Sequence, residues 1–483
     1  MNMIFNTYKM KNLKLIVSSF GIASLLSLSA CSVSFLDEAN PQAVAFDQIK
    51  DLNSLTTASV GVYSKFTESN YYGRTFTLTP DIMGDNAFIS IKNGGRYINQ
   101  DRFSITNGDG YVTGAWSLMY QVIANANLAL SAGHNLQFAT QDEQVQANQI
   151  LGELYACRAL AYFDLLRFFA QPYNFTEDAS HDGVPLITES QSSIISPPRA
   201  SVAEVYAQIV NDLKQAEQLM RPAKKNGFFT QVAAQALLSK VYLYMEDWEN
   251  AEIYASKVIN DGPYTLVSNV DYVASWAEDF NIESIFEVVF LSTDNLASNG
   301  LGYLYHQGAY GEVIATKDLY DTYTSSDVRR ELITEGSRLD GEQDAHFIWK
   351  YPRGASSYDD NIKVLRLAEI YLIRAEARAE AATPDFAGAC DDLNEIVLRA
   401  DPTATPVNLT GQDLVDRIIL ERRKELAFEG NRLFDINRKK MDLTHIQSME
   451  TREFTYPNNR FIMPIPYSER NANDNISQNP GWN

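Results

Sequence analysis

Acidic side chains are the first residues in the sequence whose spacing could support chemistry. Asp81 and Asp85 lie four positions apart, and Asn86 directly follows the second of them. Carboxylate and amide oxygens are calcium ligands, so this group could bind a cation or a polar ligand. The same stretch, TPDIMGDN, also has the residue types of a capped turn, and we favour the turn. We therefore expect no cofactor, with a bound calcium ion as the open alternative.

Catalytic motifs are absent from the 483-residue sequence. The five histidines are far apart and none lies in an HExxH pattern, which argues against a zinc hydrolase. Neither a GxSxG elbow nor a GxxxxGK phosphate loop occurs. The 61 acidic residues could supply a carboxylate pair for glycoside hydrolysis only where a fold places two of them together. We therefore expect that the protein is not an enzyme.

The charge balance excludes one class of partner. The chain has 40 Lys and Arg against 61 Asp and Glu, a formal net charge of −21 at pH 7. Nucleic-acid binding needs a surplus of cations to neutralise phosphates, so we expect no nucleic-acid partner. Hydrophobic residues make up 45% of the chain, enough for a sizeable core. Cys157 and Cys390 have no CxxC spacing, and we expect them to be core thiols.

Cys31 stands at the end of a segment that is typical of a secretory signal. Three lysines precede an apolar run over residues 15–28, and Leu-Ser-Ala leads directly into the cysteine. This ending resembles the lipobox of bacterial lipoproteins, in which the chain is cut before the cysteine and its thiol is acylated. We expect residues 1–30 to be a signal peptide and 31–41 a lipidated tether, since two or more acyl chains anchor a protein stably.

Helical periodicity dominates the chain after the tether. Apolar residues recur at spacings of three and four over 45–66, 112–132, 143–169, 201–220, 230–245, 248–259, 363–381, 385–399 and 414–440. Strand-like runs are short, at 285–291 and 346–351, and polar stretches at 69–110, 292–312 and 354–361 predict long loops. The expected fold is mainly α with long loops and a few short strands.

A repeat signature indicates how these helices pair. The segment LLSKVYLYMEDWENAEIYASKVINDGPY, residues 237–264, follows the tetratricopeptide pattern of large, small and aromatic positions that ends in a proline. Residues 367–402 form a looser second copy, and 151–169 resemble the first helix of a third. Such degenerate copies predict a scaffold of helix pairs rather than a free-standing solenoid.

Four charges lie between the apolar stripes of the expected 363–381 helix: Glu369, Arg374, Glu376 and Arg378. A helix that is apolar on two sides is buried between neighbours. Charges on such a helix are usually paired with one another and serve packing. We therefore expect ion pairs here rather than an acid/base site.

Ordered blocks of sequence carry a family resemblance from end to end. They are the lipobox at Cys31; FLDEANP at 35–41; Trp116, Tyr120, Asn125 and Asn127; RALAYFDLLRFFAQPY at 158–173; VLRLAEIYLIRAEA at 364–377; ILERRKELAFEGNRLFDINR at 419–438; and IPYSERNANDNISQNPGW at 465–482. The chain resembles the SusD/RagB family of outer-membrane nutrient-binding lipoproteins of Bacteroidetes.

This resemblance implies a fold, a partner and a location. The fold would be SusD-like, with four tetratricopeptide-like helix pairs in a single domain over 42–483, divided into an N-terminal part, 42–229, and a C-terminal part, 230–483. The protein would sit on the cell surface, lipid-anchored to the outer membrane through Cys31. There it would bind glycans and deliver them to a SusC-like TonB-dependent transporter. Members of the RagB branch bind peptides instead, and a structural or assembly lipoprotein without a small ligand is a further alternative.

A protein that binds glycans needs exposed aromatic rings beside hydrogen-bonding side chains. Aromatic residues in loops are the best candidates for these rings. Tyr303, Tyr305, His306 and Tyr310 lie in the loop at 292–312. The first long loop supplies Tyr71, Tyr72, Arg74, Asn86, Arg96, Tyr97 and Asn99. We expect the two loops to meet in one site. Trp276 could equally be a ligand-binding ring or a core residue. We expect the other four tryptophans in the core.

Overall fold

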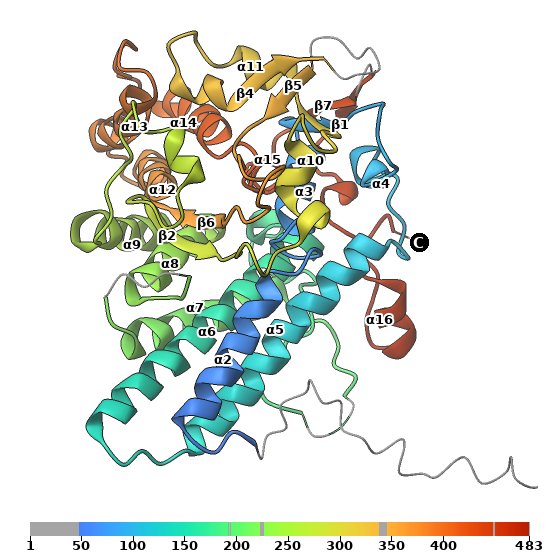
Figure 1. Cartoon of the computed structure of the whole chain (residues 1–483), viewed down its shortest axis with the longest axis vertical. Helices are drawn as coiled ribbons and strands as arrows, with labels where there is room; N and C mark the ends of the chain where they lie inside the picture. The colour runs from blue at the N-terminus through green and yellow to red at the C-terminus, as the bar shows by residue number, and fades with distance from the viewer. Residues whose placement is uncertain are drawn as a thin grey trace, which may run out of the picture. The chain divides into compact units, whose positions relative to one another are not determined.

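Three helices near the start of the chain run side by side: α2 (Leu52–Phe66), α5 (Gly110–Asn135) and α6 (Gln141–Phe169) (Figure 1). The computed structural model describes residues 48–482 except 192, 194, 223–226, 338–344 and 448–449. The predicted signal peptide, the tether and Cys31 lie outside these residues. Among the helices within them, none is both long and apolar enough to cross a membrane.

Local capping sets where the helices begin. Thr140 and Glu143 form a capping box at the start of α6, and Ser201 with Glu204 does the same for α7 (Val202–Leu219). The Asp51 side chain accepts the N–H of Ser54 and so caps α2. The predicted start of this helix at residue 45 is therefore wrong, because 49–51 are not helical and the cap fixes the first turn at Leu52.

The helices of the two predicted repeat copies, 237–264 and 367–402, pack as pairs, as the repeat signature predicts. Helix α8 (Gln231–Met245) packs on α9 (Trp248–Asp261), and α12 (Leu367–Glu380) packs on α13 (Phe386–Ala400) and on α9. The shorter helices are α3 (Thr75–Ile82), α4 (Ile98–Asp101), α10 (Leu301–Tyr305), α11 (Lys317–Asp321) and α16 (Tyr467–Ala472), with 3₁₀ turns at Tyr173–Phe175, Ala274–Ala277, Ala297–Asn299, Val328–Leu332 and Asn459–Phe461. The mainly α prediction is confirmed.

Within the described residues the strands form three small antiparallel sheets. The largest has the order β1 (Ala87–Ile89), β3 (Val313–Ala315), β5 (Ala345–Ile348), β4 (Ile333–Gly336). The others pair β2 (Ser284–Val288) with β6 (Ile362–Arg366), and β7 (Leu443–Gln447) with β8 (Glu450–Phe454). The predicted helix over 363–381 is wrong at its start, because Lys363–Arg366 pair with β2 before the chain turns into α12.

The predicted helix over 414–440 is interrupted. It consists of α14 (Gly411–Glu425) and α15 (Arg432–Arg438), separated by a turn at residues 426–431. Gly430 in this turn has φ +75°, and its N–H donates to Asp81 Oδ2 at 2.9 Å. A Cβ on Gly430 would lie 2.9 Å from Thr77 Cα in α3. The turn therefore needs glycine both for its left-handed backbone and for its close approach to α3.

The Gly430→Ala variant is expected to lose about 2–3 kcal/mol of unfolding free energy, because left-handed strain of about 1–2 kcal/mol adds to a clash of about 1 kcal/mol. Urea titration followed by circular dichroism measures the loss. The matched control is Gly411→Ala, where φ is +61° but nothing lies within 4 Å of the added Cβ. Equal losses in the two variants would show that the contact with Thr77 adds nothing.

The stretch at 69–110 is not one long loop. It contains α3, in which every residue is buried, as well as β1 and α4. Asp81 Oδ1 accepts Asn86 Nδ2 at 2.8 Å and the N–H of Phe428 at 3.0 Å, and burial raises the pKa of Asp81 to about 6. Asp85 pairs with Arg432 at 2.6 Å. Both acids are thus bonded to protein donors. Asp81 lies in α3 and Asp85 in the turn that follows it, so the prediction of a turn holds only for residues 83–86 of this stretch.

Buried ion pairs hold α12, as expected from its two apolar stripes. Glu369 lies 3.0 Å from Lys240, and Glu376 lies 2.6 Å from Arg438. The other two predicted charges, Arg374 and Arg378, bind Asp392 at 2.6 and 2.9 Å. The four charges therefore join α12 to α8, α13 and α15, and the structural interpretation is confirmed. Cys157 and Cys390 are buried free thiols, also as predicted.

The end of the chain returns to the first helices. The N–H of Met463 donates to the carbonyl of Phe168 at 2.8 Å, and Asn479 Nδ2 donates to the carbonyl of Phe169 at 2.7 Å. In addition, Trp116 Nε1 in α5 donates to Glu469 Oε2 in α16 at 3.1 Å. The first two of these bonds satisfy the Phe168 and Phe169 carbonyls, which the end of α6 leaves without a helical partner.

Candidate functional site

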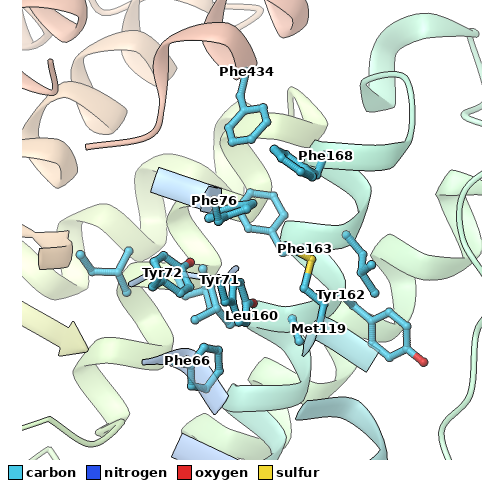
Figure 2. Packing of buried hydrophobic residues seen from close by; sticks show 14 of the residues in the cluster. Phe66, Tyr71, Tyr72, Phe76, Met119, Leu160, Tyr162, Phe163, Phe168 and Phe434 are labelled. Carbon is cyan, nitrogen blue, oxygen red and sulfur yellow. The ribbon is translucent and has the colours of Figure 1, made fainter. Parts of the chain in front are cut away.

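Tyr71 and Tyr72 do not lie on the surface, although the loop prediction placed them there. Tyr71 is 0% exposed and Tyr72 is 5% exposed. Both hydroxyls donate to Asp164 Oδ2 in α6, at 2.7 and 2.8 Å. Figure 2 shows the two rings beside Phe66, with Phe76 above them. The expectation of exposure is wrong here because the buried carboxylate of Asp164 needs donors and the rings complete an aromatic core.

Three more residues of the first loop also point inward. Arg74 Nε donates to the Tyr97 hydroxyl at 2.8 Å, and the Tyr97 ring stacks on Tyr111 with centroids 4.0 Å apart. Asn86 lies between Asp81 and Arg423 and is 1% exposed. The predicted surface position of Arg74, Asn86 and Tyr97 is therefore wrong, because each has buried protein partners.

Trp276 and Tyr305 are buried as well. Trp276 is 6% exposed, and the ammonium of Lys350 lies 4.4 Å from its ring. Tyr305 is fully buried, and its ring stacks on Tyr351 with centroids 5.7 Å apart. The expected surface position of Tyr305 is wrong because its position in α10 faces the core. For Trp276, packing is the better of the two interpretations.

Three of the remaining predicted residues, Tyr303, Tyr310 and Arg96, belong to one partly exposed aromatic group. The rings of Tyr303 and Tyr310 meet edge to face at 4.5 Å, and Tyr358 lies 5.8 Å from Tyr303. The Arg96 guanidinium lies 3.9 Å from the Tyr310 ring centroid, within cation–π range. We call Tyr303, Tyr310 and Tyr358, with Arg96, the tyrosine cluster. Tyr358 was missed from the sequence, although it lies in the polar stretch at 354–361.

The two loops meet at this cluster, as predicted. The N–H of Leu301 donates to the carbonyl of Gly73 at 3.0 Å. Glu312 Oε1 accepts both Arg96 Nη1 and the N–H of Gly94, each at 2.8 Å. Glu312 thus holds the Arg96 guanidinium near the Tyr310 ring, and the ion pair as a whole carries no net charge. Asn99 is exposed and accepts a bond from Ser104.

A small pocket lies beside the cluster, where α10 touches the turn at 353–358. Its lining includes Gly302, Tyr303, Gly354, Tyr358 and Asp360, and its volume is about 20 Å³. Gly302 and Gly354 approach so closely that a Cβ on Gly354 would lie 2.4 Å from the Gly302 carbonyl carbon. Only glycine at both positions permits this contact, and so the tyrosines on either side are brought together.

His306 lies next in the chain after α10 and packs edge to face on Trp349, with centroids 4.1 Å apart. Burial lowers the pKa of His306 below its ordinary value, so the imidazole is neutral at pH 7. Its Nδ1 accepts the N–H of Gly308 at 3.0 Å, which leaves the proton on Nε2. The ring can therefore donate one hydrogen bond from Nε2. No group of three acidic, Cys or His side chains suited to a metal occurs among the described residues.

A larger groove lies along α14, with a volume of about 390 Å³. Its described lining consists of Gln412, Val415, Asp416, Ile419, Leu420, Arg423, Arg432, Lys439 and Met441. The two arginines pair with Asp85, and the lysine pairs with Glu380. Because ligand rings stack on aromatic faces and these side chains are aliphatic or already paired, we place the candidate binding site at the tyrosine cluster.

Two family models match the chain. One, described as starch-binding and associating with the outer membrane, matches residues 34–243. The other, described as the SusD family, matches residues 345–482. The two matches together include α2 and α12, and Arg96 and Tyr358 of the tyrosine cluster lie within them.

Individual relatives align over nearly the whole chain. SusD-like protein P2 of Formosa agariphila is 27% identical over 516 residues, 95% of this chain and 98% of the relative. A SusD superfamily crystal structure from Bacteroides thetaiotaomicron superimposes with a TM-score of 0.83 at 29% identity, covering 89% of this chain and 100% of the other. A crystal structure from Bacteroides vulgatus gives a TM-score of 0.82 at 30% identity, covering 90% and 99%. The chain belongs to the SusD/RagB family.

Proposed function

We propose that the protein is a lipid-anchored outer-membrane receptor that binds glycans at the tyrosine cluster and delivers them to a SusC-like TonB-dependent transporter. The observation that carries the proposal is the set of partly exposed rings of Tyr303, Tyr310 and Tyr358 beside one pocket. Such rings can stack on the apolar C–H face of a sugar, while pocket groups bond its hydroxyls. The family description, starch-binding and associating with the outer membrane, supports the same ligand class and location.

The activity that we propose is binding alone. Affinity comes from stacking and hydrogen bonds, and no bond of the ligand is made or broken. Hand-over to a transporter suits this chemistry, because a ligand that is bound without covalent change can be released intact. Oligopeptides are the second candidate ligand, since tyrosine rings and the His306 N–H also suit peptide side chains and carbonyls.

Replacing Tyr303 and Tyr310 together by alanine is expected to weaken polysaccharide binding about 5- to 150-fold, because about 0.5–1.5 kcal/mol of ring contact is lost at each position. Native affinity electrophoresis of the full chain in a mild non-ionic detergent, through gels that contain laminarin, amylopectin or galactomannan, measures the change. The control is Tyr467→Ala, which removes a tyrosine that is 59% exposed on α16.

The outcomes separate the candidate functions. Retardation by one polysaccharide, lost in the double variant and kept in the control, supports glycan binding at the cluster. Heat released on adding oligopeptides, without retardation by any polysaccharide, would move the assignment to the peptide ligand. Retardation that survives in the double variant would place the site elsewhere on the molecule. Reducing sugar released from the retarding polymer would show that the protein is an enzyme.

A further inference from the structure

One carboxylate oxygen beside the tyrosine cluster has no hydrogen-bond partner in the part of the chain that the structure describes. The Asp360 side chain is only 8% exposed. Its Oδ1 accepts the N–H of Arg353 at 3.0 Å, whereas its Oδ2 is buried without a hydrogen bond from any described residue. A buried acceptor that is left unpaired costs about 1–3 kcal/mol. Such an atom points to a donor supplied from outside the chain.

The surroundings of Asp360 show what that donor can be. Asp360 lines the pocket between Tyr303 and Tyr358. The pocket volume of about 20 Å³ fits one water-sized group. A Cβ on Gly302 would lie 3.3 Å from Asp360 Oδ2, so the glycine keeps the space next to that oxygen open. A hydroxyl fits this space and can donate to the oxygen, whereas a carboxylate or a sulfate is both too large and without a proton to donate.

The charges around the pocket disfavour an anion. Burial raises the pKa of Asp360 to about 6, which still leaves the side chain ionised at pH 7.5. The neighbouring Arg353 is already paired with Asp279 and Asp359, and its Nε lies 3.5 Å from Asp360 Oδ1. Across the cluster, Glu312 neutralises Arg96. An anionic ligand would therefore meet the negative charge of Asp360 at a site whose two nearby arginines are already paired.

We infer that Asp360 makes the tyrosine cluster selective for uncharged glycans, by accepting a ligand hydroxyl at Oδ2 and by repelling carboxylated or sulfated polymers. The inference rests on the proposed function, since it concerns the ligand class of the same site. Selectivity of this kind combines one attractive contact with one repulsive one. The tyrosine rings stack on a sugar ring whatever the charge of the polymer. Asp360 then selects the uncharged polymers among those that can stack.

The experiment compares three uncharged polysaccharides, laminarin, amylopectin and galactomannan, with three anionic ones, alginate, polygalacturonate and carrageenan. The full chain in mild detergent is run through affinity gels at pH 7.5. We expect retardation only by an uncharged polymer. In Asp360→Asn, the amide can keep the bond to the Arg353 N–H and places an NH2 where the acceptor was. We expect at least fivefold weaker binding of the uncharged polymer and measurable binding of an anionic one.

The matched control is Asp321→Asn in α11, which removes the same charge from a side chain that is 54% exposed and lies outside the pocket lining. Its affinity should stay within twofold of the parent, and equal urea midpoints would show that both variants fold. If Asp360→Asn binds like the parent while the Tyr303/Tyr310 double variant loses binding, the proposed function stands and the inference is wrong. Equal retardation of the parent by an anionic polymer overturns it too. If no polysaccharide retards the parent, the proposed function fails, and the inference fails with it.

Discussion

Replacing Arg366 by methionine is expected to lower the free energy of unfolding by about 3–5 kcal/mol, the cost of breaking a buried ion pair on one side. Arg366 ends β6 and is 3% exposed. Its guanidinium lies 2.9 Å from Glu283, 2.6 Å from Glu425 and 2.7 Å from Glu429. Methionine fills much of the volume of the arginine side chain, so little packing is lost. The loss of stability comes from the three buried carboxylates, which are left with one cation fewer.

The state of Glu425 explains why the loss is large. Burial alone would favour its neutral form, yet three surrounding arginines, with Arg399 foremost, hold the pKa of Glu425 well below its ordinary value. The carboxylate of Glu425 therefore stays ionised at neutral pH when Arg366 is removed. It then remains buried with one positive charge fewer beside it. Chemical denaturation at pH 7 measures the change.

The surface pair of Lys317 and Asp321 provides the control. These side chains are 72% and 54% exposed, and exposed pairs contribute little because water screens them. Lys317→Met should therefore leave the denaturation midpoint nearly unchanged. If Arg366→Met were no worse than Lys317→Met, the buried cluster would contribute nothing to stability beyond the packing of its side chains.

Truncating Phe76 to alanine is expected to cost about 3–5 kcal/mol, the usual range for removing a phenylalanine from a core. Phe76 is 2% exposed, and its ring centroid lies 5.2 Å from that of Tyr72, 5.6 Å from Phe168 and 5.8 Å from Phe434 (Figure 2). The cavity would open between α3, α6 and α15, so none of the three can close it alone. The melting temperature and the urea midpoint should both fall.

The comparison for Phe76 is Phe175→Ala, because the Phe175 side chain is 38% exposed and its removal leaves no enclosed cavity. We expect a loss of less than about 1 kcal/mol for such a surface truncation. Similar losses in the two variants would mean that the aromatic core can repack around the missing ring.

The long helices could be predicted from the sequence because each has its own periodic apolar pattern. Helices α5, α6 and α8 begin and end within a few residues of the predicted ranges. The errors occur where contacts with a distant segment determine the backbone conformation. The apolar pattern predicts a helix at Lys363 to Arg366, yet these residues pair with β2, some eighty positions earlier in the chain. Likewise, Gly430 ends a continuous helical pattern because its turn must reach Asp81 in α3.

The candidate site was predictable only in part, for the same reason. The loops at 69–110 and 292–312 do meet, through Arg96 and Glu312. However, periodicity cannot show that Tyr71 turns inward to Asp164, a partner 93 positions away. Nor does it distinguish Tyr303, which faces outward on α10, from Tyr305, which is buried two residues later. Tyr358 joins the cluster through the contact of Gly302 with Gly354, which only the folded chain shows.

The return of the chain end to α6 has a consequence for how the protein is made. The carbonyl of Phe169 receives its bond from Asn479, 310 positions later. At about 5–20 residues per second, a ribosome needs roughly 15–60 s between these two residues. Throughout that interval the Phe169 carbonyl lacks this bond, so the end of α6 gains this native partner only after residue 479 has been made.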